Sequence, residues 1–193
     1  MPKVVDHEER RAELAAAVWR IASREGVEAL TIRAVAAEAG WSTGALVHYF
    51  RDKEELLLFA FESVADRTGR RMLAAAERID DPYELLRAQL VEGLPLDAER
   101  RAEVRVWFAF LGLAGTRPAL AEAGRRAYRL WRARIAETIG ALPGRAVDAE
   151  AEAAALVALV DGIAVQASFE PRAFPAARQL AMVDARLARL RRP

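Results

Sequence analysis

The sequence predicts an all-α protein, and its composition is the first reason. Alanine occurs 43 times among 193 residues, and leucine, arginine and glutamate, which are also strong helix formers, are frequent. Valine and isoleucine are scattered rather than alternating with polar residues, and no Asn-Gly or Asp-Gly pair marks a β-hairpin. The chain is long enough to bury a hydrophobic core in one large domain or two small ones.

The first two helices are predicted from apolar spacing and from residues that cap or break helices. Residues 6–25 carry apolar side chains at helical spacing on one face, and Gly26 follows as a C-terminal cap. Thr31 is a good N-cap for a second, shorter helix that ends at Gly40. We expect a positive φ at Gly40, because glycine adopts that conformation without strain.

The next two predicted helices also begin at capping residues. A third helix, capped by Ser42 or Thr43, extends to about residue 50. Asp52 caps a fourth, and Glu55, three residues later, fits the partner position of a capping box. Because no strong breaker follows for several turns, we expect this fourth helix to couple two functional parts of the chain rigidly.

Beyond the fourth helix, which runs to about residue 76, five more helices are predicted. Prolines at positions typical of a first turn help to mark where they begin. Glycines at Gly93, Gly140 and Gly144 mark chain reversals. The predicted ranges are about 82–93, 97–114, 118–139, 147–169 and 175–190.

The residues of common catalytic and metal sites are missing. Cysteine is absent, so the chain has no disulfide and no thiolate nucleophile or ligand. The two histidines, His7 and His48, are too few for a histidine-based zinc site. No GxSxG elbow, Walker loop or GxGxxG motif occurs. We therefore expect no enzymatic activity, no metal and no cofactor.

Charge and hydropathy give no sign of a membrane or of a general attraction to nucleic acid. The 29 basic and 28 acidic residues nearly cancel, so any DNA binding must arise from local geometry. No run of about 18 apolar residues suggests a membrane span, and the first residues lack the apolar stretch of a signal peptide. We expect a cytoplasmic protein without a membrane partner, and the absence of cysteine suits that reducing compartment.

The segment TIRAVAAEAGWSTGALVHYFRDK, residues 31–53, has the pattern of a helix-turn-helix. Two helices this short are unstable unless they dock on a neighbour, here the first helix. A common buried face is supplied by Ile32, Val35, Leu46 and Phe50. The side chains left exposed near the second short helix are Thr43, Gly44, Val47, His48 and Tyr49. In such a motif the second helix enters the major groove of DNA.

This N-terminal stretch resembles the DNA-binding domain of the TetR family of bacterial transcriptional regulators. The resemblance runs from the apolar first helix through TIRAVAAEAG and STGALVHYF to RDKEELL. It implies a helical homodimer, with a DNA-binding domain at residues 1–52 and a ligand-binding and dimerisation domain at residues 53–193. The implied function is that of a ligand-responsive repressor, whose partners are an inverted-repeat operator in double-stranded DNA and a small-molecule effector.

The resemblance also implies roles for single residues. Thr31 and Lys53 match phosphate contacts, while Arg33 matches a position from which some members reach a base. A guanidinium there can donate to both O6 and N7 of guanine. The predicted DNA-binding residues are Thr31, Arg33, Trp41, Ser42, Thr43, Gly44, Val47, His48, Tyr49 and Lys53.

Several alternatives remain open at this interface. Many family members have tyrosine where this chain has Val47, so one expected contact is lost or becomes a contact with a thymine methyl group. Trp41 replaces a small turn residue and either packs on the core or leans on the DNA backbone. Arg33 either reads a base or pairs with Glu38 or Glu28 on the surface.

The local charge favours no DNA partner by itself. Residues 1–53 hold eight basic and eight acidic side chains, so this part of the chain is neutral. Together with Val47, this neutrality motivates an alternative function, a helical small-molecule-binding protein with a weakened DNA-reading surface.

The C-terminal part resembles the domain shared by regulators of the choline-to-betaine pathway type. Aromatic residues on successive predicted helices line a cavity in one interpretation and fill an ordinary core in the other. An aromatic cage for a quaternary ammonium is physically possible through cation–π attraction, but the sequence does not identify the ligand. The predicted ligand-binding residues are Phe61, Trp107, Phe110, Leu111, Tyr128, Trp131 and Gln166.

The last two predicted helices are candidates for the dimer interface. Each carries an apolar stripe, and two such helices from each subunit can pack as a four-helix bundle. Asp161 interrupts one stripe, either as the partner of an arginine or as a pocket residue. The predicted interface residues are Leu156, Val157, Val160, Ala164, Leu180, Val183 and Leu187.

Overall fold

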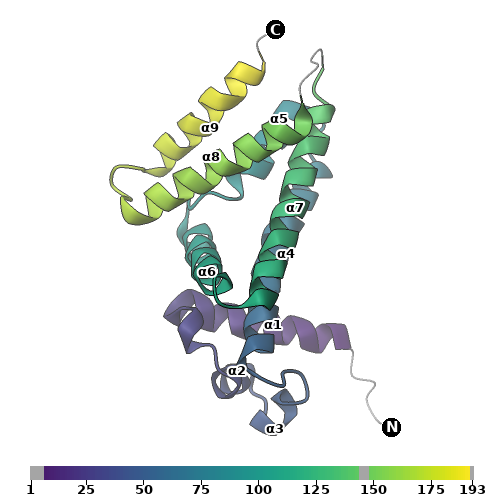
Figure 1. Cartoon of the computed structure of the whole chain (residues 1–193), viewed down its shortest axis with the longest axis vertical. Helices are drawn as coiled ribbons and strands as arrows, with labels where there is room; N and C mark the ends of the chain where they lie inside the picture. Colours follow the sequence, from purple (N-terminus) through teal and green to yellow (C-terminus); the bar gives the residue numbers. More distant parts are fainter. Residues whose placement is uncertain (1–6, 144–147, 192–193) are drawn as a thin grey trace. The chain divides into compact units, whose positions relative to one another are not determined.

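The computed structural model describes residues 7–143 and 148–191. Within these ranges it contains nine α-helices, one short 3-10 helix and no strand, which confirms the all-α prediction (Figure 1). The predicted helix starts at Asp6 and Val147 and the reversal at Gly144 lie outside the described residues.

The chain forms two compact units. The first unit comprises residues 1–65 and 105–124, and the second comprises residues 66–104 and 125–193. The first unit therefore extends beyond the predicted 1–52 domain, because the start of the fourth helix and a later segment pack with it.

The first unit begins with the helices of the predicted helix-turn-helix. They are α1 (His7–Glu25), the 3-10 helix η1 (Val27–Ala29), α2 (Ile32–Ala39) and α3 (Thr43–Leu46), and α4 (Lys53–Ala76) starts in this unit (Figure 1). Capping fixes the boundaries, since Thr31 Oγ1 accepts from the Ala34 amide and Ser42 Oγ from the Ala45 amide, both at 3.1 Å. Gly40 has φ 73° and ψ 24°, the predicted left-handed conformation.

The helix α3 is shorter than predicted. Regular α-helix ends at Leu46, and residues 47–49 continue as hydrogen-bonded turns in which the Tyr49 and Phe50 amides both donate to Leu46 O. Three of the four residues of the predicted buried face, Val35, Leu46 and Phe50, are buried, while Ile32 is only partly buried. The centroid of the Phe50 ring lies 5.1 Å from that of Phe59 on α4, so this contact packs the turns after α3 against α4.

The fourth helix begins with a variant of the predicted capping box. Asp52 Oδ1 accepts from the Glu55 amide at 2.9 Å, as a cap should. The Glu55 carboxylate accepts from the Arg51 amide at 2.8 Å, one residue before the position that a standard capping box uses. The same carboxylate also pairs with the Arg51 guanidinium, so Glu55 binds both the backbone and the side chain of Arg51.

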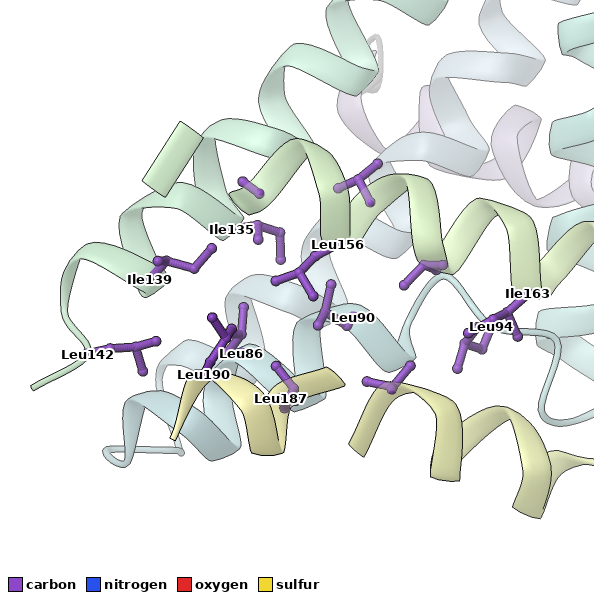
Figure 2. Packing of buried hydrophobic residues seen from close by; sticks show 14 residues of the cluster. Leu86, Leu90, Leu94, Ile135, Ile139, Leu142, Leu156, Ile163, Leu187 and Leu190 are labelled. Carbon is purple, nitrogen blue, oxygen red and sulfur yellow. The ribbon is translucent and has the colours of Figure 1, made fainter. Parts of the chain in front are cut away.

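The second unit is built mainly from five helices. These are the later parts of α4 and of α7 (Pro118–Gly140), together with α5 (Pro82–Val91), α8 (Ala149–Phe169) and α9 (Ala176–Leu190), while α6 (Ala98–Ala114) begins in this unit. Its core joins α5, α7, α8 and α9, and Figure 2 shows Leu156 of α8 beside Leu90 of α5, with Leu187 of α9 nearby. Fourteen buried apolar side chains form this cluster, and the stability of each helix depends on this packing against the others.

One described helix, α8, is long and apolar enough to cross a membrane by length and composition. No such span was expected from the sequence, because three acidic residues interrupt the apolar run. The core helix of a soluble protein passes the same test, and α8 gives seven buried side chains to the second unit. Since it is apolar on most sides, one face fills the core and another apolar face remains exposed.

Candidate nucleic-acid interface and effector site

The residues predicted to bind DNA lie in the first unit, and most of them are exposed. Val47 is 48% exposed, so an apolar side chain stands in water among polar ones. Trp41 and Tyr49 are partly buried. The exposed members are Thr31, Arg33, Ser42, Thr43, Gly44, Val47, His48 and Lys53. Their individual roles in DNA binding stay predictions.

Arg33 has neither of the surface partners considered for it. Glu38 is engaged by α1, where Arg20 Nε lies 2.6 Å and Arg24 Nη2 3.1 Å from its carboxylate oxygens. The hydrogen bond from Arg20 and then that from Arg24 hold the pKa of Glu38 below its ordinary value. Within the described part of the chain Arg33 makes no hydrogen bond or ion pair. Its guanidinium is therefore available to a ligand, as base reading requires.

Lys53 makes only a weak ion pair within the protein. Its Nζ lies 3.9 Å from Glu28 Oε2, at the limit of an ion pair, and both side chains are exposed. Such an exposed ion pair contributes little to the stability of the fold, and salt screens it. A phosphate can therefore displace Glu28 at small cost.

Trp41 is partly buried, and its predicted packing on the core or on the DNA backbone stays a prediction. Its ring is partly exposed in the turn between α2 and α3, with its centroid 5.5 Å from that of Tyr49 in an edge-on arrangement. The guanidinium carbon of Arg10 on α1 lies 5.4 Å from the Trp41 centroid. Sequence reasoning did not single out Arg10, because the contact joins two separate helical segments; the only sequence signal was a large ring in this turn.

The predicted ligand-binding residues fall into both units. In the first unit the Phe61 ring stacks on Trp107, with centroids 5.0 Å apart, and meets the edge of Phe110 at 5.3 Å. Phe61 and Phe110 are buried, while Trp107 and Leu111 are partly exposed. These side chains form one aromatic cluster between α4 and α6, and their contact with a ligand stays a prediction.

In the second unit Tyr128 and Trp131 lie close to Asp161. The two rings are stacked with centroids 6.4 Å apart, and the Tyr128 hydroxyl donates to Asp161 Oδ2 at 2.8 Å. Burial raises the pKa of Asp161, and the hydrogen bond from Tyr128 opposes part of that rise. Asp161 thus has a tyrosine as its partner and, within the described residues, no arginine.

The Trp131 ring is fixed by close packing but has an unused donor. Its Nε1 is buried and has no acceptor among the described residues. A Cβ built on Gly93 would lie 2.9 Å from the Trp131 ring and 2.7 Å from Val160 Cγ1, so glycine is the residue that fits there. Gln166, by contrast, is exposed and donates to Gly162 O within its own helix at 3.2 Å, so nothing joins it to these rings.

The residues predicted for the dimer interface require a correction. Six of them are buried inside the second unit, and Leu180 is partly buried. Five of them belong to the core cluster that α8 and α9 form with α5 and α7 within one chain, so they are not an open surface for a second copy. The buried six are Leu156, Val157, Val160, Ala164, Val183 and Leu187.

A charged cluster in the second unit was not predicted. Arg71 on α4 binds Glu103 on α6 and Glu92, and Arg100 binds the other oxygen of Glu92 at 2.6 Å. Arg67, one turn before Arg71, also pairs with Glu103. The sequence signal was a pair of arginines four residues apart on one helix and a matching pair of glutamates on another.

Comparison with known proteins identifies the family. The family described as "Bacterial regulatory proteins, tetR family" matches residues 14–59, and "BetI-type transcriptional repressor, C-terminal" matches residues 82–192. The chain belongs to the TetR family. The match at 14–59 spans the helix-turn-helix, and that at 82–192 spans most of the second unit.

Two named TetR-family relatives are similar over most of their length. The HTH-type transcriptional regulator PksA of Bacillus subtilis is 38% identical over 175 residues, which cover 89% of this chain and 84% of PksA. The HTH-type transcriptional regulator BetI of Paraburkholderia xenovorans is 32% identical over 168 residues, 84% of each chain. The chain is thus a DNA-binding transcriptional regulator of the TetR family and not an enzyme.

Solved structures agree with this TetR-family assignment. A transcriptional regulator from Rhodococcus superposes with a TM-score of 0.80 at 34% identity, covering 92% of this chain and 94% of the other. A putative regulator from Saccharomonospora viridis, solved in complex with choline, also has a TM-score of 0.80, at 27% identity over 93% of this chain and 95% of the other.

Proposed function

We propose that this TetR-family chain is a ligand-responsive repressor that binds an inverted-repeat operator as a homodimer in the cytoplasm. The observation that carries the proposal is the unpaired Arg33 guanidinium beside the exposed residues of α3. A surface whose DNA-reading role had been lost would have no reason to keep Glu38 engaged by two arginines of α1 and Arg33 unpaired. This favours the repressor over a ligand-binding protein without DNA recognition.

The test of the operator is selection of duplexes from a random-sequence pool with the purified protein. A two-fold symmetric dimer should recover an inverted repeat whose half-sites are separated by about one helical turn or a little more. Recovery of single half-sites, or of no shared sequence, would contradict the proposal.

Dimerisation has a better surface than the one predicted from sequence. The outward face of α8 carries small or apolar residues at alternating spacings of four and three, the pattern that keeps two helices in contact along a seam. Phe169 at its end is 83% exposed and Val165 is 40% exposed. The face consists of Ala151, Ala155, Ala158, Gly162, Val165 and Phe169. Small side chains allow the α8 helices of two copies to approach closely, so we place the interface there.

Gly162→Arg tests this interface. A Cβ at Gly162 meets nothing within 4 Å in the chain, so a single subunit accommodates a longer residue, whereas two closely packed helices do not. We expect monomers by sedimentation velocity and a large loss of operator affinity. Ala133→Arg, at an exposed position of α7, is the matched control and should remain dimeric. A dimeric Gly162→Arg protein would move the interface away from this face.

We further propose that the effector is a small organic cation bound at Asp161. Three observations support this: a partly buried carboxylate whose described partner is neutral Tyr128, the stacked rings of Tyr128 and Trp131 beside it, and a relative solved with choline. Aromatic faces attract quaternary ammonium groups, and a cation would compensate the buried charge.

Choline and its neutral analogue 3,3-dimethyl-1-butanol are the probes for this site. The Trp131 fluorescence should respond to choline, and Asp161→Asn should remove the preference for choline over the alcohol. Operator DNA should weaken choline binding by the same factor by which choline weakens operator binding. Equal binding of both probes would refute the cation class, and equal choline affinity with and without DNA would refute its role as effector.

A further inference from the structure

Arg10 and Trp41 form a contact that lies beside the recognition helix. Arg10 belongs to α1, and its guanidinium carbon stands 5.4 Å from the centroid of the Trp41 ring. Trp41 immediately precedes Ser42, the N-cap of α3, and its ring also meets the edge of Tyr49. The ring thus contacts both the arginine of α1 and a tyrosine of the recognition segment.

The charge of Arg10 has no acidic partner within residues 7–143 and 148–191. Glu13 lies one turn further along α1, within reach of an ion pair, yet Arg10 has no carboxylate partner in the described residues. Further along the same helix, Arg20 and Arg24 are both bound to Glu38. Arg10 therefore keeps a full positive charge whose described neighbour is an aromatic face.

Stacking on a ring leaves an arginine able to bind an anion. The guanidinium is planar, and its five N–H groups lie in the plane, so a ring covering one face leaves these donors available. The ring also restricts the side chain, which reduces the entropy lost when the donors bind. Phosphate oxygens are well suited to such a fork of donors.

We propose that Arg10, positioned by Trp41, is an additional contact to a DNA phosphate flanking the recognition helix. Arg10 lies before the residues 14–59 that match the family model. It supplies positive charge where the neutral composition of residues 1–53 provides none overall. Trp41 acts as a positioning residue, because it holds Arg10 rather than replacing its charge.

The test compares Arg10→Gln with Arg11→Gln in the full-length protein. Arg11 is the adjacent arginine on α1, but its guanidinium carbon stands 4.8 Å from the centroid of Phe59 instead, so it is a matched control. The probes are a fluorescent duplex recovered by selection and a duplex of scrambled sequence, titrated by anisotropy over a series of salt concentrations.

Arg10→Gln should weaken binding to both duplexes and make the salt dependence shallower by about one phosphate contact. The ratio of the DNA affinity of the unaltered protein to that of Arg10→Gln should then fall about three- to fourfold between roughly 50 and 200 mM salt. Arg11→Gln should leave affinity and slope unchanged. An unchanged slope in Arg10→Gln, or an equal loss in Arg11→Gln, would overturn the proposal.

Trp41 variants separate positioning from folding. Trp41→Phe should keep most of the affinity and slope, because it retains a ring, whereas Trp41→Leu should show the same loss as Arg10→Gln. In the Arg10→Gln background Trp41→Leu should cause no further loss, provided that both proteins have the melting temperature of their parent. Additive losses at an unchanged melting temperature would show that Trp41 does not act through Arg10.

Discussion

Arg71 binds the carboxylate of Glu103 through two parallel hydrogen bonds, from Nη1 to Oε1 at 2.9 Å and from Nη2 to Oε2 at 2.5 Å. Arg71 Nε also donates to Glu92 at 2.5 Å. The hydrogen bonds that Arg71 donates to Glu103 are the main reason that the pKa of Arg71 is raised, in spite of burial. These bonds tie the later part of α4 to the start of α6 within the second unit, at a point where Glu103 is only 5% exposed.

Removing the charge of Glu103 should therefore destabilise the protein. Glu103→Gln leaves Arg71 partly buried with one partner fewer, and we expect a loss of about 2 kcal/mol, below the usual cost of breaking a fully buried pair because Arg71 is partly exposed. Urea denaturation followed by circular dichroism measures it. Glu99→Gln, which breaks the more exposed pair with Arg67, is the control and should cost less than about 1 kcal/mol. Equal losses of unfolding free energy in the two variants would show that the buried pair stabilises the protein no more than the exposed one.

Replacing Arg33 and replacing Lys53 should change DNA binding in different ways. Arg33→Ala should relax the preference at one position of each half-site at a cost of about 1–3 kcal/mol, because a base-reading guanidinium is lost. Lys53→Ala should weaken all sequences alike and reduce the salt slope by about one unit. Binding to a panel of single-base operator variants distinguishes the two, and a uniform loss in both mutants would make Arg33 a backbone contact.

The stability of the protein should depend on pH through Asp161. Because burial raises the pKa of this carboxyl, the folded state keeps its proton at pH values where the unfolded chain has lost it, near and above about 3.9. This group then lowers stability as the pH rises through the folded pKa, and the cost is present in full above it.

Asp161→Asn should accordingly raise the melting temperature at neutral pH, and the gain should shrink as the pH falls. Thermal unfolding at several pH values measures this difference. Asp184→Asn is the control, because Asp184 is only partly buried and pairs with Arg87 Nε at 2.6 Å, so its loss should give no gain. A gain for Asp161→Asn that is independent of pH would mean that the charge is not its cause.

Two glycines of the helix-turn-helix should respond in opposite ways to alanine. Gly40→Ala should cost about 1 kcal/mol in stability, because φ is +73° although the space for a Cβ is open. Gly44 lies in α3, and its Cβ would meet only Ser42 Oγ at 4.0 Å. Gly44→Ala should thus stabilise by up to about 1 kcal/mol while reducing operator affinity, since the added methyl prevents close approach to DNA. Urea denaturation and anisotropy provide the two measurements, and a loss of stability in Gly44→Ala would contradict this account.

The helix boundaries could be predicted because capping is a local interaction. Thr31 and Ser42 bond to amides three residues away, so their effect is visible in sequence alone. The end of α3 was placed too late, because the apolar and aromatic residues after Leu46 pack equally well from turns.

The faces of α8 could not be assigned from periodicity. This helix is apolar on most sides, so more than one stripe fits a helical repeat, and the stripe with the larger side chains fills the core of its own chain. That Arg33 would stay unpaired and that Asp161 would bind Tyr128 could not be predicted from the sequence, for a different reason. Glu38 is bound from α1 and Asp161 from α7, and such contacts between separate helices leave no trace in local spacing.

The tight fit at Gly93 has a consequence for mutational tolerance. In a saturation scan this position should behave like an essential residue, although it has no side chain and binds nothing. Any replacement displaces Val160 or Trp131, and Val160→Ala as a second-site suppressor removes only the first obstacle, because the indole remains 2.9 Å away. A revertant would need a smaller residue at position 131 as well, so the glycine can be exchanged only together with the tryptophan.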